Sequence, residues 1–245
     1  MSKKKQYDER VLAMTRQQHL THYVLRTRFR RYGAVSYIGH LDLMNLFGRT
    51  VRKTGLPILY SQGFNPRPEM VFALPLGVGI NTEGDYVDIS MSVKVEPDEF
   101  IEKMTPLLPD GLEIVSVVYK DEPKNSLMSV VTHAEYALEA PGITECIKKI
   151  MTMDVIEVEK KAKGKIVTND IRPQILKFLE EQSTADRACL MVMAGSSSNL
   201  RPESILQACV RYAGLEQVSA DNAGVTRLCL YGGEYPNTRL IEDFV

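Results

Sequence analysis

His40 is the residue in this chain whose type and setting best suit acid–base chemistry. It stands in the stretch Y-I-G-H-L-D, so Tyr37 and Asp42 are close to it in sequence, and Tyr60 follows further along the chain. An imidazole beside a phenol and a carboxylate can supply general acid–base catalysis for RNA cleavage without a metal ion. A histidine at a helix start also packs or caps that helix, and we expect this structural role for His40.

Other catalytic chemistries find little support in the sequence. The four cysteines, Cys146, Cys189, Cys209 and Cys229, make no C-x-x-C pair and no zinc spacing, and no Ser-His-Asp arrangement or phosphate-binding P-loop is present. We therefore predict no metal and no cofactor, and free thiols in a reducing compartment. No apolar run approaches a membrane span and the N-terminus lacks a signal-type apolar segment, so we predict a cytoplasmic protein without a membrane partner.

Charge is distributed unevenly along the chain although the formal net charge is −1. Residues 1–60 hold 12 Lys and Arg against 3 Asp and Glu, whereas residues 61–140 hold 5 against 14. A basic face attracts polyanions. The alternative is that the two regions neutralise each other across one surface, and the sequence leaves both options open.

The basic residues fall on three neighbouring segments that we predict to form one RNA-binding surface. Residues 22–32 alternate as a strand with arginines on one face, residues 40–54 form a helix with a basic face, and S-Q-G-F-N-P-R-P (61–68) is a polar loop. Cations would contact phosphates and an exposed phenylalanine would stack on a base. The predicted RNA-binding residues are Arg26, Arg28, Arg30, Arg49, Arg52, Lys53, Phe64, Asn65 and Arg67.

Two further arginines precede prolines in D-I-R-P (170–173) and N-L-R-P (199–202). Arg172 and Arg201 would lie beside turns, where each could hold an anion or a carboxylate. The acidic residues Asp85 and Asp88 sit near Glu83 on a predicted strand, and we expect them to be solvated.

The order of the predicted elements indicates an α+β fold. Residues 22–120 read as strand, helix, strand, strand, helix and strand, with helices near 40–54 and 97–108, and residues 132–245 repeat this order with an extra hairpin. This is the ferredoxin-like arrangement, in which two helices pack on one face of an antiparallel sheet. We predict a flexible basic tail at 1–21, two ferredoxin-like units at 22–120 and 132–245, and a linker at 121–131.

The helix at 40–54 positions the predicted site and needs a buried face. Leu43, Met44, Phe47 and Val51 recur at helical spacing, so we predict them to be core residues. Gly55 suits the end of the helix and Pro57 prevents its continuation.

The chain resembles the radical-SAM-linked domain of unknown function over about residues 22–240. The resemblance rests on long motifs: R-T-R-F-R-R-Y-G (26–33), S-Y-I-G-H-L-D-L-M (36–44), G-L-P-I-L-Y-S-Q-G-F-N-P-R-P (55–68), F-A-L-P-L-G-V-G (72–79), D-I-R-P and N-L-R-P. Members of that family occur alone or fused behind a cobalamin-binding radical S-adenosylmethionine domain, which implies a radical enzyme as partner. This chain lacks the C-x-x-x-C-x-x-C cluster motif of such enzymes. Where the family pattern often has histidine, this chain has Arg67, which argues against catalysis by the loop.

Three functions follow as expectations. The first is a non-catalytic RNA-binding protein that uses the basic surface. The second is an accessory protein that presents substrate to a cobalamin-dependent radical enzyme, which would need a deep pocket or an apolar patch. The third is a metal-independent RNA endonuclease in which His40 is the acid or base. The residues favour a protein that is not an enzyme.

Overall fold

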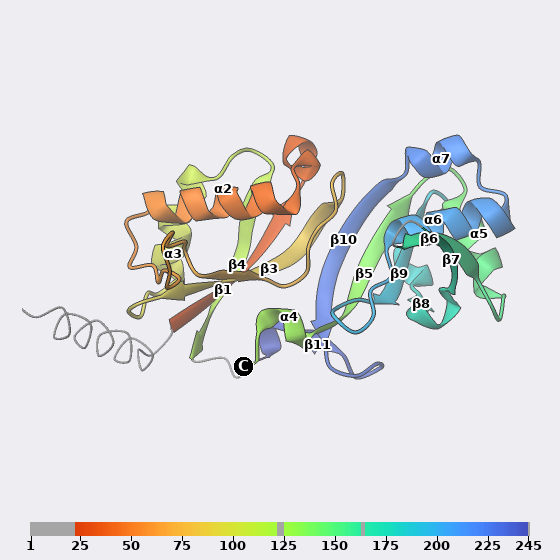
Figure 1. The fold of residues 1–245 in the computed structure, drawn as a ribbon. Helices are drawn as coiled ribbons and strands as arrows, with labels where there is room; N and C mark the ends of the chain where they lie inside the picture. The colour runs from red at the N-terminus through yellow and green to blue at the C-terminus, as the bar shows by residue number, and fades with distance from the viewer. Residues whose placement is uncertain (1–22, 122–124, 163–164, 245) are drawn as a thin grey trace, which may run out of the picture.

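A nine-stranded, mostly antiparallel sheet runs through both halves of the described chain (Figure 1). The computed structural model describes residues 23–121, 125–162 and 165–244. The main path of the sheet is β4-β1-β3-β10-β5-β9-β8, with β2 added to β3 and β11 added to β10. The strands are β1 (Tyr23–Arg31), β2 (Met70–Phe72), β3 (Asn81–Met91), β4 (Leu112–Asp121), β5 (Val131–Glu139), β8 (Ile175–Phe178), β9 (Arg187–Met193), β10 (Gly224–Gly232) and β11 (Arg239–Leu240).

Two helices, α2 (His40–Lys53) and α3 (Pro97–Met104), cover one face of the sheet in the first half. Phe47 from α2 and Phe100 from α3 belong to the same buried cluster as Phe29 and Ile89 from the sheet. The strands of this half pair antiparallel, so both the pairing and the shared face predicted for residues 22–120 are confirmed.

The sequence explains why α2 forms where it does. Leu43, Phe47 and Val51 are buried and Met44 is half-buried, because they form the apolar stripe that faces the sheet. Gly39 is the extended residue before the helix, Asp42 lies in the first turn, and Arg52 and Lys53 lie in the last turn. These charges oppose the helix dipole at each end.

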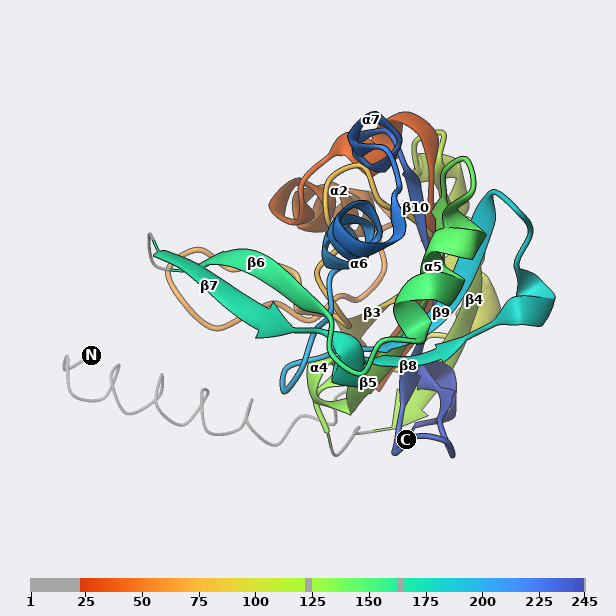
Figure 2. The same cartoon turned by 90° about the vertical axis from the view of Figure 1, so that its right-hand side faces the viewer.

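The second half carries its helices over β5, β9 and β10. They are α5 (Ile143–Met151), α6 (Pro202–Ala208), a π-helical turn (Cys209–Ala213) and α7 (Gln217–Asp221). Between α5 and β8 a separate hairpin, β6 (Glu157–Ala162) with β7 (Lys165–Asp170), projects from the body of the protein (Figure 2). The extra hairpin expected in this half is therefore present, whereas α7 and the π-helical turn were not predicted.

The two halves meet where β3 and β10 run parallel. Asn81 pairs with Thr226 and Thr82 with Arg227, and the Thr82 hydroxyl donates to the Arg227 carbonyl at 3.1 Å. Leu76, Ile80 and Tyr86 from the first half pack in the buried cluster of the second half. We call this junction the seam; the sheet and the apolar core are continuous across it.

The segment 239–244, here called the C-terminal segment, crosses the sheet face of the first half that α2 and α3 leave uncovered. Arg26 on β1 donates from Nη1 to the carbonyls of Ile241 at 3.0 Å and Phe244 at 2.7 Å. Lys120 on β4 donates to the Glu242 carbonyl at 2.6 Å, and Ile241 is fully buried. This face of β1 is therefore covered by the protein itself.

The region predicted as the linker 121–131 contains a short helix, α4 (Leu127–Val130), with Leu127 buried in the second-half cluster. The predicted tail 1–21 lies outside the described residues. No helix within the described ranges is long and apolar enough to cross a membrane.

Candidate functional site

Arg26 is not available to an RNA phosphate. It is 2% exposed, and its guanidinium makes two hydrogen bonds with Asp88, Nε to Oδ1 at 2.8 Å and Nη2 to Oδ2 at 2.9 Å. The strand alternation expected for β1 is correct, and the expected solvated state of Asp88 is wrong. The C-terminal segment covers this face of β1, and the alternation of residues along the strand could not indicate that.

Arg28 and Arg30 are also engaged with the protein. Arg28 lies 3.9 Å from a Glu242 carboxylate oxygen and 6.0 Å from the Tyr86 ring centroid, against the backbone of Gly84. A Cβ at Gly84 would come within 2.7 Å of the Arg28 guanidinium, so this glycine makes room for it. Arg30 is half-exposed but pairs with Glu83 and Glu113. The β1 arginines thus contribute little free positive charge.

The other predicted RNA-binding residues remain exposed. Arg49, Arg52 and Lys53 lie on the outer face of α2, and the loop between α2 and β2 lies below that helix in Figures 1 and 2. Residues 61–67 are all exposed, and the Phe64 side chain is completely solvated at 105%. The loop is closed at its base by hydrogen bonds between Ser61 and Arg67. We call these six residues, Arg49, Arg52, Lys53, Phe64, Asn65 and Arg67, the α2–loop surface.

His40 sits at the first turn of α2 and faces inward. Its ring meets Phe72 edge-on, with 5.5 Å between centroids, while Tyr37 and Asp42 are exposed. Burial lowers the pKa of His40 below its ordinary value, and nearby Arg227 and Arg31 act in the same direction against Asp85. The side chain is therefore held neutral against the core, which fits packing better than catalysis.

His40→Gln should flatten the pH dependence of stability on the acid side. Because the pKa of folded His40 lies below the unfolded value, the unfolded chain takes up more protons, and stability falls as the pH drops from about 7 toward 5. The slope from one such group is at most about 1.4 kcal/mol per pH unit. Urea unfolding at several pH values measures it. Burial also lowers the pKa of His133, but this group contributes equally to wild type and variant. Equal acid slopes in the two proteins would therefore contradict the assignment of the slope to His40.

Asp85 is buried at the seam, contrary to the expectation that it is solvated. Its Oδ2 accepts a 2.5 Å hydrogen bond from Arg227 Nη2, and Arg227 also donates to the Leu74 carbonyl at 3.0 Å and to the Tyr136 hydroxyl at 3.3 Å. Burial alone would lower the pKa of Arg227, but the adjacent Asp85 carboxylate raises it above its ordinary value. Both side chains are almost completely inaccessible to solvent.

Arg31 completes this buried group, which we call the seam cluster (Arg31, Asp85 and Arg227). Arg31 Nη2 donates at 2.8 Å to the carbonyls of Gly77 and Ile80, and Nη1 donates to Ile38 at 3.2 Å. Burial, with the positive charge of Arg227, lowers the pKa of Arg31 to about 10. It remains protonated at neutral pH, so the seam cluster holds two cations for one carboxylate.

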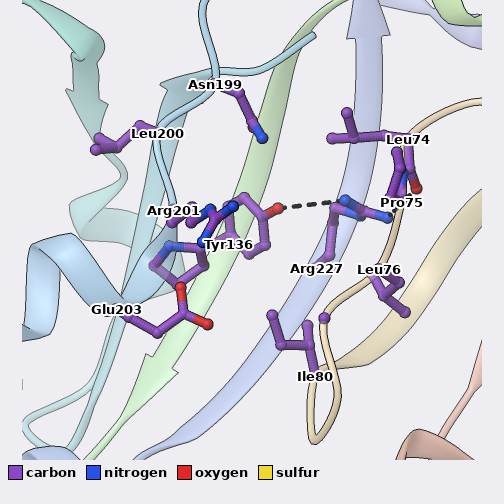
Figure 3. Close-up of a pocket in the computed structure, with 12 residues that line it drawn as sticks. Leu74, Pro75, Leu76, Ile80, Tyr136, Asn199, Leu200, Arg201, Glu203 and Arg227 are labelled. Carbon is purple, nitrogen blue, oxygen red and sulfur yellow. Dashed lines mark hydrogen bonds between the residues drawn. The ribbon is translucent and has the colours of Figure 1, made fainter. Parts of the chain in front are cut away.

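A cavity of about 390 Å³ is lined by one member of the seam cluster, Arg227 (Figure 3). Leu74, Leu76 and Ile80 line one side, and Asn199, Arg201 and Glu203 point into it from the other. Tyr136 and Arg227 lie between the two sides, on β5 and β10. A second cavity of about 420 Å³ adjoins it, lined by residues of β6, β7 and α6, and Asn199, Leu200, Arg201 and Glu203 border both. We call the pair the seam cleft.

The two arginines expected as anion contacts have different surroundings. Arg172 donates to the carbonyls of Met153 and Ile175, both at 3.1 Å, so its guanidinium is used to hold the chain. Arg201 is exposed, and its side chain has no hydrogen bond or ion pair with any described residue. The seam cluster and Tyr136 were not predicted as site residues. The one sequence signal that pointed here was the pair of motifs F-A-L-P-L-G-V-G and N-L-R-P, which form the two sides of the cleft.

No group of three or more potential metal ligands is found in the part of the chain that the structure describes.

The fold and these surfaces define an α+β protein with an internal charged seam. A family model described as an uncharacterized protein conserved in bacteria (DUF2344) matches residues 24–202. The chain belongs to this family. The matched range contains the α2–loop surface, Asp85, and Asn199 and Arg201 of the seam cleft. No curated protein matches the chain.

Proposed function

We propose that this is a non-catalytic RNA-binding protein and that the α2–loop surface is its binding site. The observation that carries the proposal is a group of exposed cations without carboxylate partners on α2 and on the loop that follows it, where Phe64 is completely exposed. The binding surface is narrower than the sequence indicated, because the β1 arginines are paired or covered.

The charge state of the surface supports a polyanionic partner. Among the described residues, Arg26, Arg28, Arg30, Arg187 and Arg227 all have carboxylate partners, whereas Arg49, Arg52, Lys53 and Arg67 have none. Cations that are already paired on the protein gain little from a phosphate, whereas unpaired exposed cations keep their full attraction for the phosphate backbone.

Phe64 supports a single-stranded rather than a duplex partner. A phenylalanine that is completely exposed contributes nothing to the core, and the loop 61–67 that carries it presents polar side chains around it. Unpaired bases stack on such rings with little dependence on sequence, for about 1–3 kcal/mol per base. Duplex bases are not accessible in this way.

The Arg49→Glu/Arg52→Glu double variant should bind single-stranded RNA more weakly and with a smaller salt dependence. Each lost phosphate contact should change the slope of log affinity against log salt by about 0.7. The measurement is fluorescence anisotropy of a labelled mixed-sequence single-stranded RNA across a salt series. Phe64→Ala should weaken binding by about 1–3 kcal/mol with an unchanged salt slope, because stacking carries no net charge.

A matched control is Lys149→Glu/Lys177→Glu, which makes the same charge change at exposed positions of α5 and β8. It should retain wild-type affinity apart from a small general effect. If both double variants lose affinity equally, the interaction follows net charge and not this surface. If wild type binds no RNA above background, the proposal fails and the accessory function becomes the leading one.

For the fold, we propose that each half is a ferredoxin-like unit. The support is the strand order in the sheet, which is β4-β1-β3-β2 in the first half and β10-β5-β9-β8 in the second. If β6 and β7 are left out, both halves place their fourth, first, third and second strands side by side in that order. Each half also follows the order strand, helix, strand, strand, helix, strand, with β6 and β7 inserted in the second.

The second candidate function is an accessory protein for a cobalamin-dependent radical enzyme. The motif resemblance suggests that partner, and the seam cleft is the observation that favours substrate presentation. An RNA endonuclease that uses His40 is less well supported, because that ring packs against Phe72. The four cysteines are free thiols, which agrees with the cytoplasmic location we propose.

A further inference from the structure

We infer that the seam cleft binds a small organic anion, with its charged group near Arg201 and Arg227 and its apolar body against Leu76 and Ile80. The site is separate from the α2–loop surface. It draws its walls from both halves of the chain, so a ligand there would bridge the two halves.

The shape of the cleft suits a metabolite-sized ligand. Its two cavities, of about 390 and 420 Å³, adjoin along residues 199–203. Small-molecule sites are commonly about 300–1,000 Å³ with an apolar lining and a few convergent polar groups. Here Leu74, Leu76 and Ile80 form the apolar side, and Asn199, Arg201 and Glu203 converge from the other (Figure 3).

The charge of the site selects an anion. The seam cluster has one more cation than carboxylate, and it lies immediately behind the wall: Arg31 donates to the carbonyls of Gly77 and Ile80, which line the cavity. Arg201 adds a cation without a carboxylate partner, and Glu203 offsets one of these charges. Glu159 lines only the second cavity, so the positive excess belongs to the first cavity, where Arg227 and Arg201 lie. A net positive charge in a partly desolvated cleft is stabilised by a bound anion.

Unsatisfied polar atoms at the seam support the same conclusion. Arg227 is 1% exposed, lines the cavity, and has an Nε without a hydrogen-bond partner. Asp85 Oδ1 and Arg31 Nε in the same cluster also lack partners among the described residues. Buried polar atoms are nearly always paired in stable cores, and of these three only the Arg227 Nε belongs to a residue that lines the cavity. That Nε–H is a donor that a ligand anion would satisfy.

Arg227 and Arg201 would divide the recognition. Hydrogen bonds to Asp85, Tyr136 and the Leu74 carbonyl hold the Arg227 guanidinium in place before any ligand binds. Arg201 has no such anchor and can close on the anionic group. A carboxylate and a phosphate monoester both match a guanidinium, so the test must separate these two sources of the same chemistry.

The test is thermal unfolding of the full chain with four organic anions: AMP and UMP as phosphate monoesters, and phenylpyruvate and indole-3-acetate as carboxylates. Adenosine is the control for a ligand body without an anionic group, and inorganic phosphate is the control for the anionic group without a ligand body. An anion at about 100 times its Kd should raise Tm by about 5–10 °C, whereas the two controls should give much smaller shifts. A shift with one pair only identifies the anionic group.

Two variants locate the effect. Arg201→Gln should remove most of the shift by deleting the free cation, and Asn199→Trp should remove it by filling the border between the cavities. Arg49→Glu/Arg52→Glu should keep the full shift, which separates this site from the RNA surface. If none of the four anions exceeds the controls, or if Arg201→Gln and Asn199→Trp respond as wild type does, the inference is wrong, whatever the RNA measurements give.

Discussion

Asp85→Leu should lower the free energy of unfolding by about 3–5 kcal/mol, because it leaves Arg227 and Arg31 buried without their carboxylate. Burial is the main cause of the depressed pKa of Arg31, and the positive charge of Arg227 lowers it further while Asp85 opposes both. With Asp85 gone, their repulsion is no longer offset and both remain in a low-dielectric environment. Urea unfolding at pH 7 measures the loss.

Asp85→Leu/Arg227→Met should be more stable than the sum of its two single variants predicts, because the pair is removed together. Asp154→Leu is the matched control, since Asp154 is exposed and has no ion pair in the described structure, and it should change stability by less than about 0.5 kcal/mol. An Asp85→Leu protein as stable as wild type would show that the seam cluster does not depend on this carboxylate.

Phe47→Ala should destabilise the protein by a similar amount, about 3–5 kcal/mol, through cavity formation. Phe47 is fully buried at the centre of an aromatic group, 5.1 Å from the Phe29 ring centroid and 5.4 Å from that of Phe72. Those rings come from β1 and β2, so the cavity cannot close without moving strands. The urea midpoint measures the change.

Asn45→Ala is the control for the Phe47 substitution. It lies on the exposed side of the same helix, so it tests helix propensity without burial and should leave the midpoint nearly unchanged. Equal effects of the two substitutions would mean that α2 contributes to stability through its backbone and not through the packed face.

Local periodicity predicted the elements of the first half well. The apolar stripe of Leu43, Phe47 and Val51 identified α2 and its buried face, and alternation identified the two faces of β1. These properties depend on residues a few positions apart, which a sequence displays directly. The helix predicted near 97–108 ends four residues past the end of α3 at Met104, because the chain continues as a 3-10 helix at Thr105–Leu107.

The charged pairs could not be predicted in this way. Arg26 and Asp88 are 62 residues apart, and Arg227 and Asp85 are 142 apart. An arginine on a strand face looks the same in sequence whether water or another segment covers it. The seam cleft depends on residues 74–80 meeting 199–203, and no pattern within either stretch indicates the other.

The C-terminal segment has a consequence for protein synthesis and for truncation. Arg26 and the Ile241 carbonyl that it binds are separated by 215 positions, so a ribosome makes the first half long before the segment that covers it. Until then the sheet face that carries Arg26 and Arg28 on β1 and Lys120 on β4 is open to any polyanion, including the ribosome's own RNA. A fragment ending at β4 would keep that face open permanently, and nucleic-acid binding by such a fragment would report on surface that the longer chain buries.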